Sequence, residues 1–525
     1  MKKFTLFLFI IGFSLCNISI SIAQPGSLDE TFDGDGKLTF SFGVTGDLGY
    51  AVAIQEDGKI VFVGYAEVAE DIDFAIARIN TDGTLDNSFD MDGKVTTDFN
   101  NTMDVPVAVK IQPDGKILAA GYSLFNNPFF ALARYNTDGS LDDSFGIGGL
   151  VTTIITDDDQ AFAMELQDDG KILLAGMTHE DGNYEDFALA RYNTDGSLDN
   201  SFGTGGKVIT DIIGFHDAAN GVAVQADGKI IVVGYSGNGE PNGADFAMVR
   251  YNTDGSFDAS FGVGGKVRTD FYGNTDMANS IVIQPDGKII LGGTAISAYG
   301  YDFAVARYNT DGALDLSFGD GGKVTSSFLN QYTDIGFSLV LQEDGKVILA
   351  GFATSTGQVT DFGMVRYNAD GSQDMSFGFL GAVIIDFEGT NERCFSAAIQ
   401  SDNKIILAGY TSSDQTDPDF AIARCISGLE TGILDFSKTQ NQIYIYPNPI
   451  LDCATLKYTL QKDEKISIDL YDMKGVIVQS FISNIRKPIG NNEEILCFSD
   501  ALPNGYYNLV ISNKEGRHSI KIIIQ

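Results

Sequence analysis

The residues with the clearest chemistry are an arginine and an aspartate that recur together along the chain. Each arginine lies in a run of the form Phe-Ala-x-Ala-Arg-Tyr-Asn with small variations, and each aspartate follows in the run Ser-Leu-Asp or a variant of it. On a strand, side chains alternate, so Arg78 shares a face with the apolar Phe74 and Ile76 and needs a carboxylate partner. The alternative is a ring of arginines that binds an anion. We predict structural pairs that include Arg78–Asp86, Arg134–Asp142 and Arg191–Asp199.

The loop between these two residues offers oxygen ligands at alternate positions. In one repeat they are Asn136, Asp138 and Asp142, a spacing that can coordinate Ca²⁺. The same run is typical of a turn, in which Asp-Gly takes the left-handed conformation and Asn bonds nearby backbone. No Glu follows at the position of a bidentate calcium ligand. We therefore favour the turn, keep calcium as the alternative, and predict no other cofactor.

No combination of residues predicts catalysis. The histidines His179, His216 and His518 have no motif around them, and neither a Gly-x-Ser-x-Gly nucleophile nor a metal-ligand helix occurs. Acidic side chains are too abundant for a glycosidase-like pair to be selected without distances. We therefore name no catalytic residue.

The composition is that of a folded and strongly acidic protein. The 525 residues include 34 Lys and Arg against 71 Asp and Glu, a net charge of −37, and 44% are hydrophobic. The hydrophobic share is sufficient for a core. The acidic balance provides no basic surface for phosphate, so we expect neither nucleic acid nor anionic lipid as a partner.

The N-terminus has the pattern of a signal peptide. Two lysines precede an apolar run over Phe4–Leu15, and the small residues Ser21 and Ala23 stand before the predicted cleavage site. The run is short for a bilayer span, and no later segment is apolar enough to be one. We predict removal of residues 1–23 and export of the mature chain by way of the periplasm.

Three markers show that one unit recurs seven times. The aspartate of Gln-x-Asp-Gly-Lys, or of its degenerate last copy, lies at 57, 114, 169, 227, 286, 344 and 402. The paired arginine lies at 78, 134, 191, 250, 307, 366 and 424, and the Ser-Leu-Asp aspartate or its variant at 29, 86, 142, 199, 258, 315 and 374. Each unit holds four strand-like runs, which in the fourth unit are Val222–Gln225, Lys229–Tyr235, Phe246–Asn252 and Lys266–Phe271.

Seven four-stranded units that cannot bury their faces alone predict an all-β fold, a seven-bladed β-propeller. A β-solenoid is the structural alternative, although the unit is long for a single coil. The chain begins with only a fourth strand, at Lys37–Phe42, and the last unit, from about Phe395, stops before its own fourth strand. We therefore predict that Lys37–Phe42 completes the last blade and closes the ring.

These units resemble the delta-60 repeats of bacterial surface and secreted proteins. The resemblance rests on the Gln-x-Asp-Gly-Lys hairpin, the apolar strand that ends in Gly, and the run Asp-Phe-Ala-x-Ala-Arg-Tyr-Asn-x-Asp-Gly-Ser-Leu-Asp. It covers residues 27–426, within a propeller domain that we place at 24–426. The resemblance implies the propeller fold and no particular activity.

The loops on the two faces of such a propeller differ in kind. Connections between the first and second and between the third and fourth strands are nearly identical in every unit, whereas the other connections vary in length and content. Varied loops on a repeated scaffold are typical of a contact surface. The densest polar and aromatic group there is His179, Glu180, Asp181 and Tyr184. We take these residues as ligand candidates, with an ordinary solvated loop as the alternative.

A second β module follows a linker at 427–440. Over 441–525, short alternating runs such as Ala454–Leu460 and Lys465–Tyr471 predict a small β-sandwich. Its motifs contain Tyr446, Pro447, Asn448, Pro449, Gly475, Gly505, Tyr507 and Lys521. With them the module resembles the type A sorting domain of the type IX secretion system of Bacteroidetes. The resemblance implies passage through the Sec channel, contact with the type IX secretion machinery, removal of the module, and release or attachment at the outer cell surface.

Two pairs of cysteines remain after the predicted cleavage. Cys453 and Cys497 lie in the C-terminal module, where an oxidising periplasm permits a disulfide. Cys394 and Cys425 lie on the first and third strands of one unit, near opposite ends of the blade, so we expect no bond between them.

Two classes of function are consistent with these observations. The favoured one is a secreted or cell-surface propeller that binds an extracellular glycan or protein through its varied face. The alternative is a secreted hydrolase or lyase that acts on polysaccharide with propeller carboxylates. Aromatic side chains gathered on the varied face would favour binding, and two carboxylates about 5–10 Å apart in a central pocket would favour hydrolysis.

Overall fold

Every regular element in the described part of the protein is a β-strand, and the chain divides into two units, Met1–Gly428 and Leu429–Gln525. The structure is a computed structural model. It describes residues 24–43, 46–68, 71–99, 102–125, 127–179, 184–237, 239, 243–297, 300–328, 333–354, 359–389, 391–413, 416–429, 444–446, 450, 452–460, 462–471, 477–499, 502–503, 505–512 and 517–524. The predicted signal peptide and most of the predicted linker lie outside these residues.

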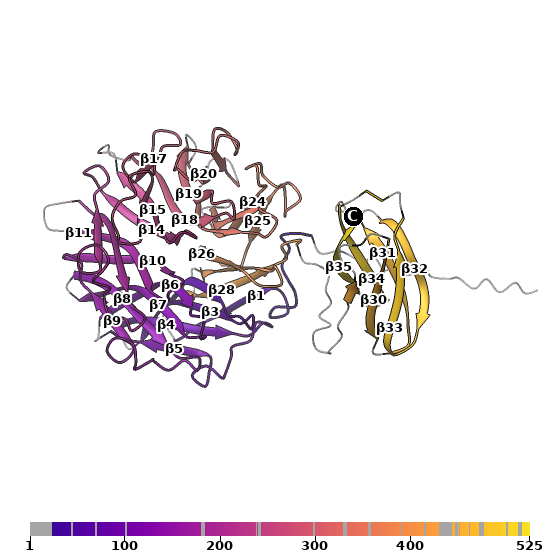
Figure 1. Ribbon diagram of the computed structural model, residues 1–525. Helices are drawn as coiled ribbons and strands as arrows, with labels where there is room; N and C mark the ends of the chain where they lie inside the picture. Colours follow the sequence, from indigo (N-terminus) through magenta and orange to yellow (C-terminus); the bar gives the residue numbers. More distant parts are fainter. Residues whose placement is uncertain are drawn as a thin grey trace, which may run out of the picture. The chain divides into compact units, whose positions relative to one another are not determined.

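The first unit consists of seven four-stranded antiparallel blades (Figure 1). The first three blades are β2 (Asp47–Ile54), β3 (Ile60–Val68), β4 (Asp71–Ile79) and β5 (Lys94–Thr97); β6 (Met103–Ile111), β7 (Ile117–Phe125), β8 (Asn127–Tyr135) and β9 (Leu150–Thr153); β10 (Asp158–Leu166), β11 (Ile172–His179), β12 (Asp186–Tyr192) and β13 (Lys207–Thr210).

The remaining four blades repeat the same order of long and short strands. They are β14 (Asp217–Val224), β15 (Ile230–Gly237), β16 (Ala244–Tyr251) and β17 (Lys266–Thr269); β18 (Asp276–Ile283), β19 (Ile289–Ser297), β20 (Gly300–Tyr308) and β21 (Lys323–Ser326); β22 (Asp334–Leu341), β23 (Val347–Thr354), β24 (Thr360–Tyr367) and β25 (Ala382–Ile385); β26 (Asn391–Ile399), β27 (Ile405–Ser413), β28 (Thr416–Cys425) and β1 (Lys37–Phe40).

The blades close into a ring. The first strands β2, β6, β10, β14, β18, β22 and β26 each contact the first strands of both neighbouring blades, so they form the innermost layer around the axis (Figure 1). Apolar clusters fill the space between neighbouring sheets; one of them joins Leu173 and Leu189 to Val232 and Val249 of the next blade. The seven-bladed β-propeller predicted from the repeats is confirmed.

The N-terminal segment supplies the missing strand of the last blade. In Figure 1 the indigo β1 lies beside the orange β28, and the two are antiparallel, with Lys37 opposite Ala423 and Phe40 opposite Phe420. The same pairing continues outside the strands, since Leu28 bridges to Cys425. The predicted closure by residues from Lys37 onward is therefore present, with the strand itself ending at Phe40.

The first strand of each blade is longer than its apolar run predicts. In the fourth blade the prediction began at Val222, whereas β14 begins at Asp217, because a bulge between Ala219 and Gly221 interrupts the alternation that marks a strand. The bulge also explains the glycine that follows the apolar run inside each second strand. A Cβ at Gly64 would lie 1.9 Å from the carbonyl oxygen of Leu48, just before the bulge of β2.

The second unit consists of two sheets around one core. The sheets are β29 (Tyr444–Tyr446), β30 (Cys453–Leu460) and β33 (Gly490–Cys497), and β32 (Ile477–Lys487), β31 (Glu464–Tyr471), β34 (Gly505–Ser512) and β35 (Arg517–Ile524). Leu456, Ile468 and Leu509 are fully buried between them. Cys453 and Cys497 face each other across β30 and β33 and form the disulfide that the sequence left open, while Cys394 and Cys425 are buried and free.

Candidate functional site

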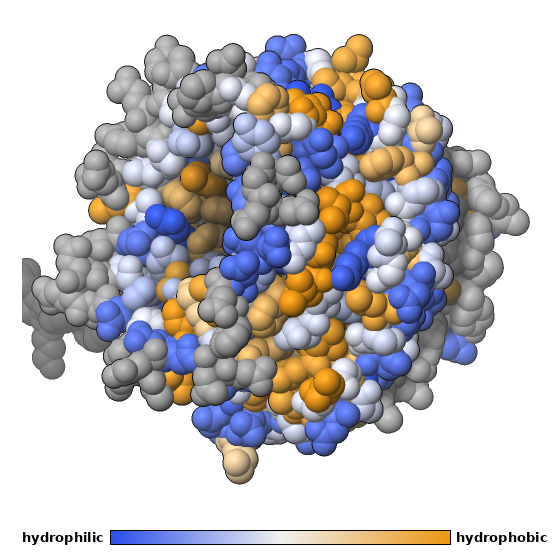
Figure 2. Space-filling view, turned by 90° about the vertical axis from the view of Figure 1, so that its left-hand side faces the viewer, coloured by the Kyte–Doolittle hydropathy of each residue, from blue (hydrophilic) through white to orange (hydrophobic). Residues whose placement is uncertain are grey.

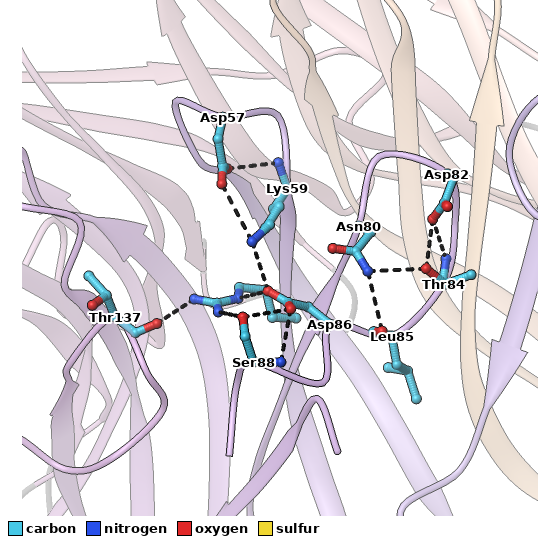
Figure 3. Close-up of polar contacts among 10 residues, drawn as sticks. Asp57, Lys59, Asn80, Asp82, Thr84, Leu85, Asp86, Ser88 and Thr137 are labelled. Carbon is cyan, nitrogen blue, oxygen red and sulfur yellow. Dashed lines mark hydrogen bonds and ion pairs between the residues drawn. The ribbon is translucent and has the colours of Figure 1, made fainter. Parts of the chain in front are cut away.

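Each predicted arginine lies in a polar cluster with its predicted aspartate (Figure 3). In the first blade, Arg78 Nε donates to Asp86 Oδ2 at 2.7 Å, and Lys59 Nζ lies 2.9 Å from the same oxygen. Ser88 donates to the other carboxylate oxygen, Oδ1, at 2.7 Å. The equivalent Nε–Oδ2 distances are 2.7 Å for Arg134–Asp142 and 2.9 Å for Arg191–Asp199.

The arginines also link neighbouring blades. Arg78 Nη1 donates to the carbonyl oxygen of Thr137 in the turn of the next blade, and its guanidinium lies 4.7 Å from the ring centre of Phe89. Burial acts to raise the pKa of Asp142, but hydrogen bonds from Lys116 and Ser144 and the charge of Arg134 outweigh it and hold that pKa well below its usual range. Protein groups therefore contact the guanidinium in each of these clusters, as the predicted structural pairs require.

The side chains that were considered as calcium ligands form hydrogen bonds with other protein groups, several of them in the same turn. Asn136 Nδ2 donates to Ser140 and to the Leu141 carbonyl, and Asp138 Oδ1 accepts the Ser140 amide and hydroxyl. The Asp142 carboxylate accepts bonds from Arg134, Lys116 and Ser144. This is the arrangement of the turn that the sequence favoured.

The ligand candidates of the third blade lie on two sides of a gap in the described chain. His179 ends β11 and Tyr184 resumes the chain, 46% exposed, whereas Glu180 and Asp181 lie outside the described residues. Tyr184 does meet an aromatic group, the ring of His216, whose centre is 4.6 Å from its own. His216 Nδ1 contacts the Glu185 carboxylate. The loop between the second and third strands of the blade and the loop that leads from its fourth strand to the next blade therefore lie on the same face of the propeller, as predicted.

A carboxylate that the repeat markers missed lies at the first or second position of the first strand of every blade. It is Asp47, Asp104, Asp159, Asp217, Asp276, Asp334 or Glu392, and each of these residues is fully buried or nearly so. Each accepts the backbone amide that follows the fourth strand of the preceding blade, as Phe99 N donates to Asp104 Oδ2 at 2.7 Å. Burial raises the pKa of Asp104 and of Asp334 to about 6. The spacing between these carboxylates varies and one of them is Glu, so they were not recognised as a repeat marker in the sequence.

The bulges of the first strands place one extra residue per blade at the same level of the inner ring. These residues are Tyr50, Val107, Phe162, Asn220, Asn279, Phe337 and Phe395, and all seven are partly exposed. Aromatic rings dominate one side of this bulge ring, and two amides lie on the other. Asn220 Nδ2 donates to Asn279 Oδ1 at 3.1 Å.

Three of the four aromatic residues of the bulge ring form a continuous run across three blades. The ring centres of Phe337 and Phe395 are 4.9 Å apart, and those of Phe395 and Tyr50 are 5.1 Å apart and stacked. Tyr65 and Tyr410, on the adjacent second strands, extend the run at 6.0 and 5.9 Å.

One basic side chain stands beside this aromatic run. Arg393, two residues before Phe395, lies with its guanidinium 5.1 Å from the ring centre of Phe352, and its Nε is buried without a hydrogen-bond partner. Burial raises the pKa of Tyr50, so its phenol stays protonated as a donor. The group can therefore stack on an apolar face and donate hydrogen bonds at its edge. The sequence signal for this aromatic group was that the residue type at the bulge varies between otherwise similar first strands.

The comparisons with known proteins agree with this architecture. Residues 55–89, 112–145, 167–202, 225–261, 284–318, 342–377 and 400–424 match the family "Domain of unknown function (DUF5122) beta-propeller". The chain therefore carries seven repeats of this family. Residues 444–525 of this DUF5122 propeller protein match a "Secretion system C-terminal sorting domain", which implies secretion to the cell surface or the extracellular space. No curated protein matches the chain.

Several solved structures are similar to this chain at low identity. A catalytically inactive virginiamycin B lyase from Staphylococcus aureus, with quinupristin, is 12% identical, with a TM-score of 0.43 over 74% of this chain and 98% of its own. PorZ of Porphyromonas gingivalis, a component of the type IX secretion system, is 10% identical, with a TM-score of 0.29 over 90% and 68%. The polysaccharide lyase Uly1 is 11% identical, with a TM-score of 0.35 over 72% and 90%. At these values no function is transferred.

The structure describes some of the predicted sorting-motif residues and not others. Tyr446 ends β29, Gly505 begins β34, Lys521 lies on β35, and Tyr507 is buried with its hydroxyl donating to the Pro503 carbonyl at 2.6 Å. Pro447, Asn448, Pro449 and Gly475 lie outside the described residues. Within the described ranges, no helix is long and apolar enough to span a membrane.

Hydrophobic side chains also reach the outer surface of the propeller. Met91, Ile147, Val263 and Phe379, in the connections between third and fourth strands, are more than 80% exposed. They lie in four different blades. Hydrophobic residues, drawn in orange, alternate with hydrophilic ones on the side of the molecule in Figure 2.

Proposed function

We propose that this DUF5122 propeller is a glycan-binding protein that acts outside the cell, with the bulge ring as its binding site. The observation that carries the proposal is the stacked aromatic run Phe337, Phe395 and Tyr50, partly exposed on the innermost strands. Binding sites for small or chain-like ligands combine aromatic walls with a few placed polar groups.

A glycan fits this chemistry better than a folded protein surface does. The C–H faces of sugar rings stack on flat aromatic rings, and hydroxyl groups take hydrogen bonds from tyrosine, amide and guanidinium donors. Tyr50, Asn220 and Arg393 supply such groups around the bulge ring. The ring lies on the innermost strands, where a chain can reach more readily than a broad surface.

Enzymatic cleavage of a polysaccharide, by hydrolysis or by a lyase reaction, has less support at this ring. The seven bulge residues are aromatic, aliphatic or amide, so none of them is a carboxylate or a histidine, and the phenol of Tyr50 is the one ionisable group among them. The buried carboxylates that begin the first strands accept backbone amides instead. A protein partner and an enzymatic activity are therefore treated as outcomes of the test.

The experiment is a binding screen of the purified mature chain on immobilised glycans. Phe395→Ala and Tyr50→Ala remove the stacked pair, and each is expected to weaken binding about fivefold or more, since one aromatic contact contributes about 1 kcal/mol or more. Phe379→Ala is the matched control, because this phenylalanine is exposed on the other set of connections. Far-UV circular dichroism checks that each variant folds.

Three results would contradict the proposal. The first is glycan binding that survives both substitutions unchanged. The second is release of shortened or unsaturated sugars, which would favour the enzymatic alternative. The third is capture of proteins only, with no glycan bound.

We infer that the C-terminal module directs export through the periplasm and is then removed. The support is its match to a sorting domain together with the predicted signal peptide. Deletion of residues 444–525 should leave the propeller in the periplasm, whereas the full chain should reach the medium or the cell surface. Cell fractionation and the mass of the exported chain test this; export of the deletion variant would contradict it.

A further inference from the structure

Arg393 differs from every other arginine whose side chain the structure describes, because no carboxylate of the described residues pairs with it. The seven repeated arginines pair with the repeated aspartates, Arg268 pairs with Asp245, and Arg486 pairs with Asp463. Arg393 Nε, by contrast, is buried without a hydrogen-bond partner in the described structure. Withdrawal of a guanidinium from water is costly unless an anion reaches it, so Arg393 is prepared for a partner that the chain does not supply.

Arg393 also departs from the repeat at its own position. It lies on β26 opposite Tyr410, two residues before the bulge. The residues two positions before the bulge in the other first strands are Leu48, Val105, Gln160, Ala218, Met277 and Ile335. None of these six carries a charge, so the propeller scaffold needs no cation at this position. The arginine is a property of the last blade alone.

The guanidinium of Arg393 lies in the aromatic part of the bulge ring. It is 5.1 Å from the ring centre of Phe352, which is in turn 6.0 Å from that of Phe337. Burial raises the pKa of Tyr50 and of Tyr410, and the nearby charge of Arg393 opposes this shift in both. Both phenols therefore stay protonated and neutral. The side chains around Arg393 can stack or donate hydrogen bonds, but they cannot neutralise it.

The carboxylate next to Arg393 in the sequence is engaged elsewhere. Glu392 is fully buried and accepts the backbone amides of Phe387 and Gly389 at 2.9 and 2.7 Å. Successive side chains of a strand point to opposite faces, so Glu392 and Arg393 are directed away from each other. The charge of Arg393 thus remains available to a ligand, and the residue is partly exposed.

We propose that Arg393 binds a carboxylate carried by one sugar of the glycan, so that the bulge ring recognises an acidic glycan. This inference rests on the proposed glycan-binding function of the same ring. A guanidinium presents its N–H groups in a planar fork that matches a carboxylate. Because Nε is buried, the fork that meets the ligand is that of the two Nη atoms. The stacked run of Phe337, Phe395 and Tyr50 then holds the neighbouring sugars.

The charge of the whole chain limits how acidic this glycan can be. The protein has a net charge of −37, which repels a densely charged polyanion. Arg393 is one positive charge, and the six equivalent positions add none. We therefore expect a single uronic acid flanked by neutral sugars as the unit that the ring recognises.

The test is a binding assay of the purified mature chain on three matched sets of immobilised oligosaccharides. The first set carries one glucuronic or galacturonic acid among neutral sugars, the second is the same set with each carboxyl group reduced to an alcohol, and the third carries a sulfate ester in place of the carboxyl group. The uronate set should bind best, and carboxyl reduction should weaken binding about tenfold or more. Binding of the uronate set, unlike that of the reduced set, should weaken as NaCl rises from about 0.02 to about 0.5 M.

Two substitutions at Arg393 separate charge from geometry. Arg393→Gln keeps hydrogen-bond donors without the charge, so it should weaken uronate binding about tenfold or more and leave binding of the reduced set nearly unchanged. Arg393→Lys keeps the charge without the planar fork and should bind uronate with intermediate affinity. Lys323→Gln is the matched control, because it removes a positive charge from the fourth strand β21, where Lys323 Nζ donates to the backbone carbonyl of Asp270. It should change neither affinity, and far-UV circular dichroism checks that each variant folds.

The outcomes distinguish this inference from the function on which it rests. Equal binding before and after carboxyl reduction would overturn the inference and leave a neutral-glycan site. Unchanged uronate binding by Arg393→Gln, or a preference for the sulfated set, would overturn it as well. Failure to bind any of the three sets would instead contradict the proposed function itself, and the inference with it.

Discussion

Arg424 and Asp29 form an ion pair across the closure of the ring. Arg424 Nε lies 2.7 Å from Asp29 Oδ2, although 395 residues separate them, whereas Arg78 and its equivalents pair with an aspartate eight residues later. Arg424 Nη1 also donates to the carbonyl of Thr81 in the first blade. One guanidinium therefore joins the N-terminal segment, the last blade and the first blade.

Removal of this pair should destabilise the whole propeller. Asp29→Ala leaves the buried Arg424 charge without its carboxylate, which costs about 3–5 kcal/mol in the free energy of unfolding. Urea unfolding followed by fluorescence measures the loss. Glu30→Ala, at an exposed neighbouring position, should change the free energy by less than about 0.5 kcal/mol. Equal stability of the Asp29 variant and the original chain would show that the closure does not depend on this pair.

The internal pairs can be tested at Arg191. Arg191→Ala should lower the unfolding midpoint, and Arg191→Lys should do so too, because one ammonium cannot reach both Asp199 and the Thr253 carbonyl as Nε and Nη1 do. Arg191→Met combined with Asp199→Leu should recover much of the loss, since no unpaired charge is left. An unchanged midpoint in Arg191→Ala would refute the structural role.

Stability should be greatest in mildly acidic solution. Burial raises the pKa of Asp334 to about 6, so the folded chain holds a proton that the unfolded chain releases, and stability falls as the pH rises through this range. The pKa of Asp142 is instead held below its usual value, so that contribution is lost as the pH falls below about 4.

Thermal unfolding between pH 3 and pH 8 tests this profile. The midpoint should pass through a maximum near pH 4–5.5, and Asp334→Asn should flatten the decline above it. Asp334→Asn is informative because the amide stays neutral at every pH while it keeps an oxygen for the Phe328 amide. A midpoint that rises steadily from pH 5 to pH 8 would contradict the assignment.

Reduction of the disulfide should affect only the C-terminal unit. Cys453 and Cys497 enclose a loop with a sequence separation of 44, for which the chain-entropy model gives about 4 kcal/mol. Cys453→Ser should therefore lower the midpoint of residues 444–525 and leave the propeller transition in place. Calorimetry of the full chain resolves the two transitions, and loss of the propeller transition would contradict the independence of the units.

Local repetition made the propeller predictable. The Gln-x-Asp-Gly-Lys hairpin and the Arg and Asp markers recur at nearly constant intervals, so they indicated blade number, strand order and the missing strand at Lys37 without any distance. The bulge residues were not predicted as a site. Tyr50 and Phe395 lie in short runs where a bulge breaks the alternation, and nothing in either run indicates that their side chains stack.

The sequence by itself determined the seven like units, their closure by the first strand and the sorting module, because these depend on local propensity and on the count of strands. Only the tertiary structure decided which residues from different blades meet. The stacking of Tyr50 on Phe395 and the approach of Arg393 to Phe352 arise when the ring closes, and such contacts depend on the bulges and on the angle between sheets, which no repeat encodes.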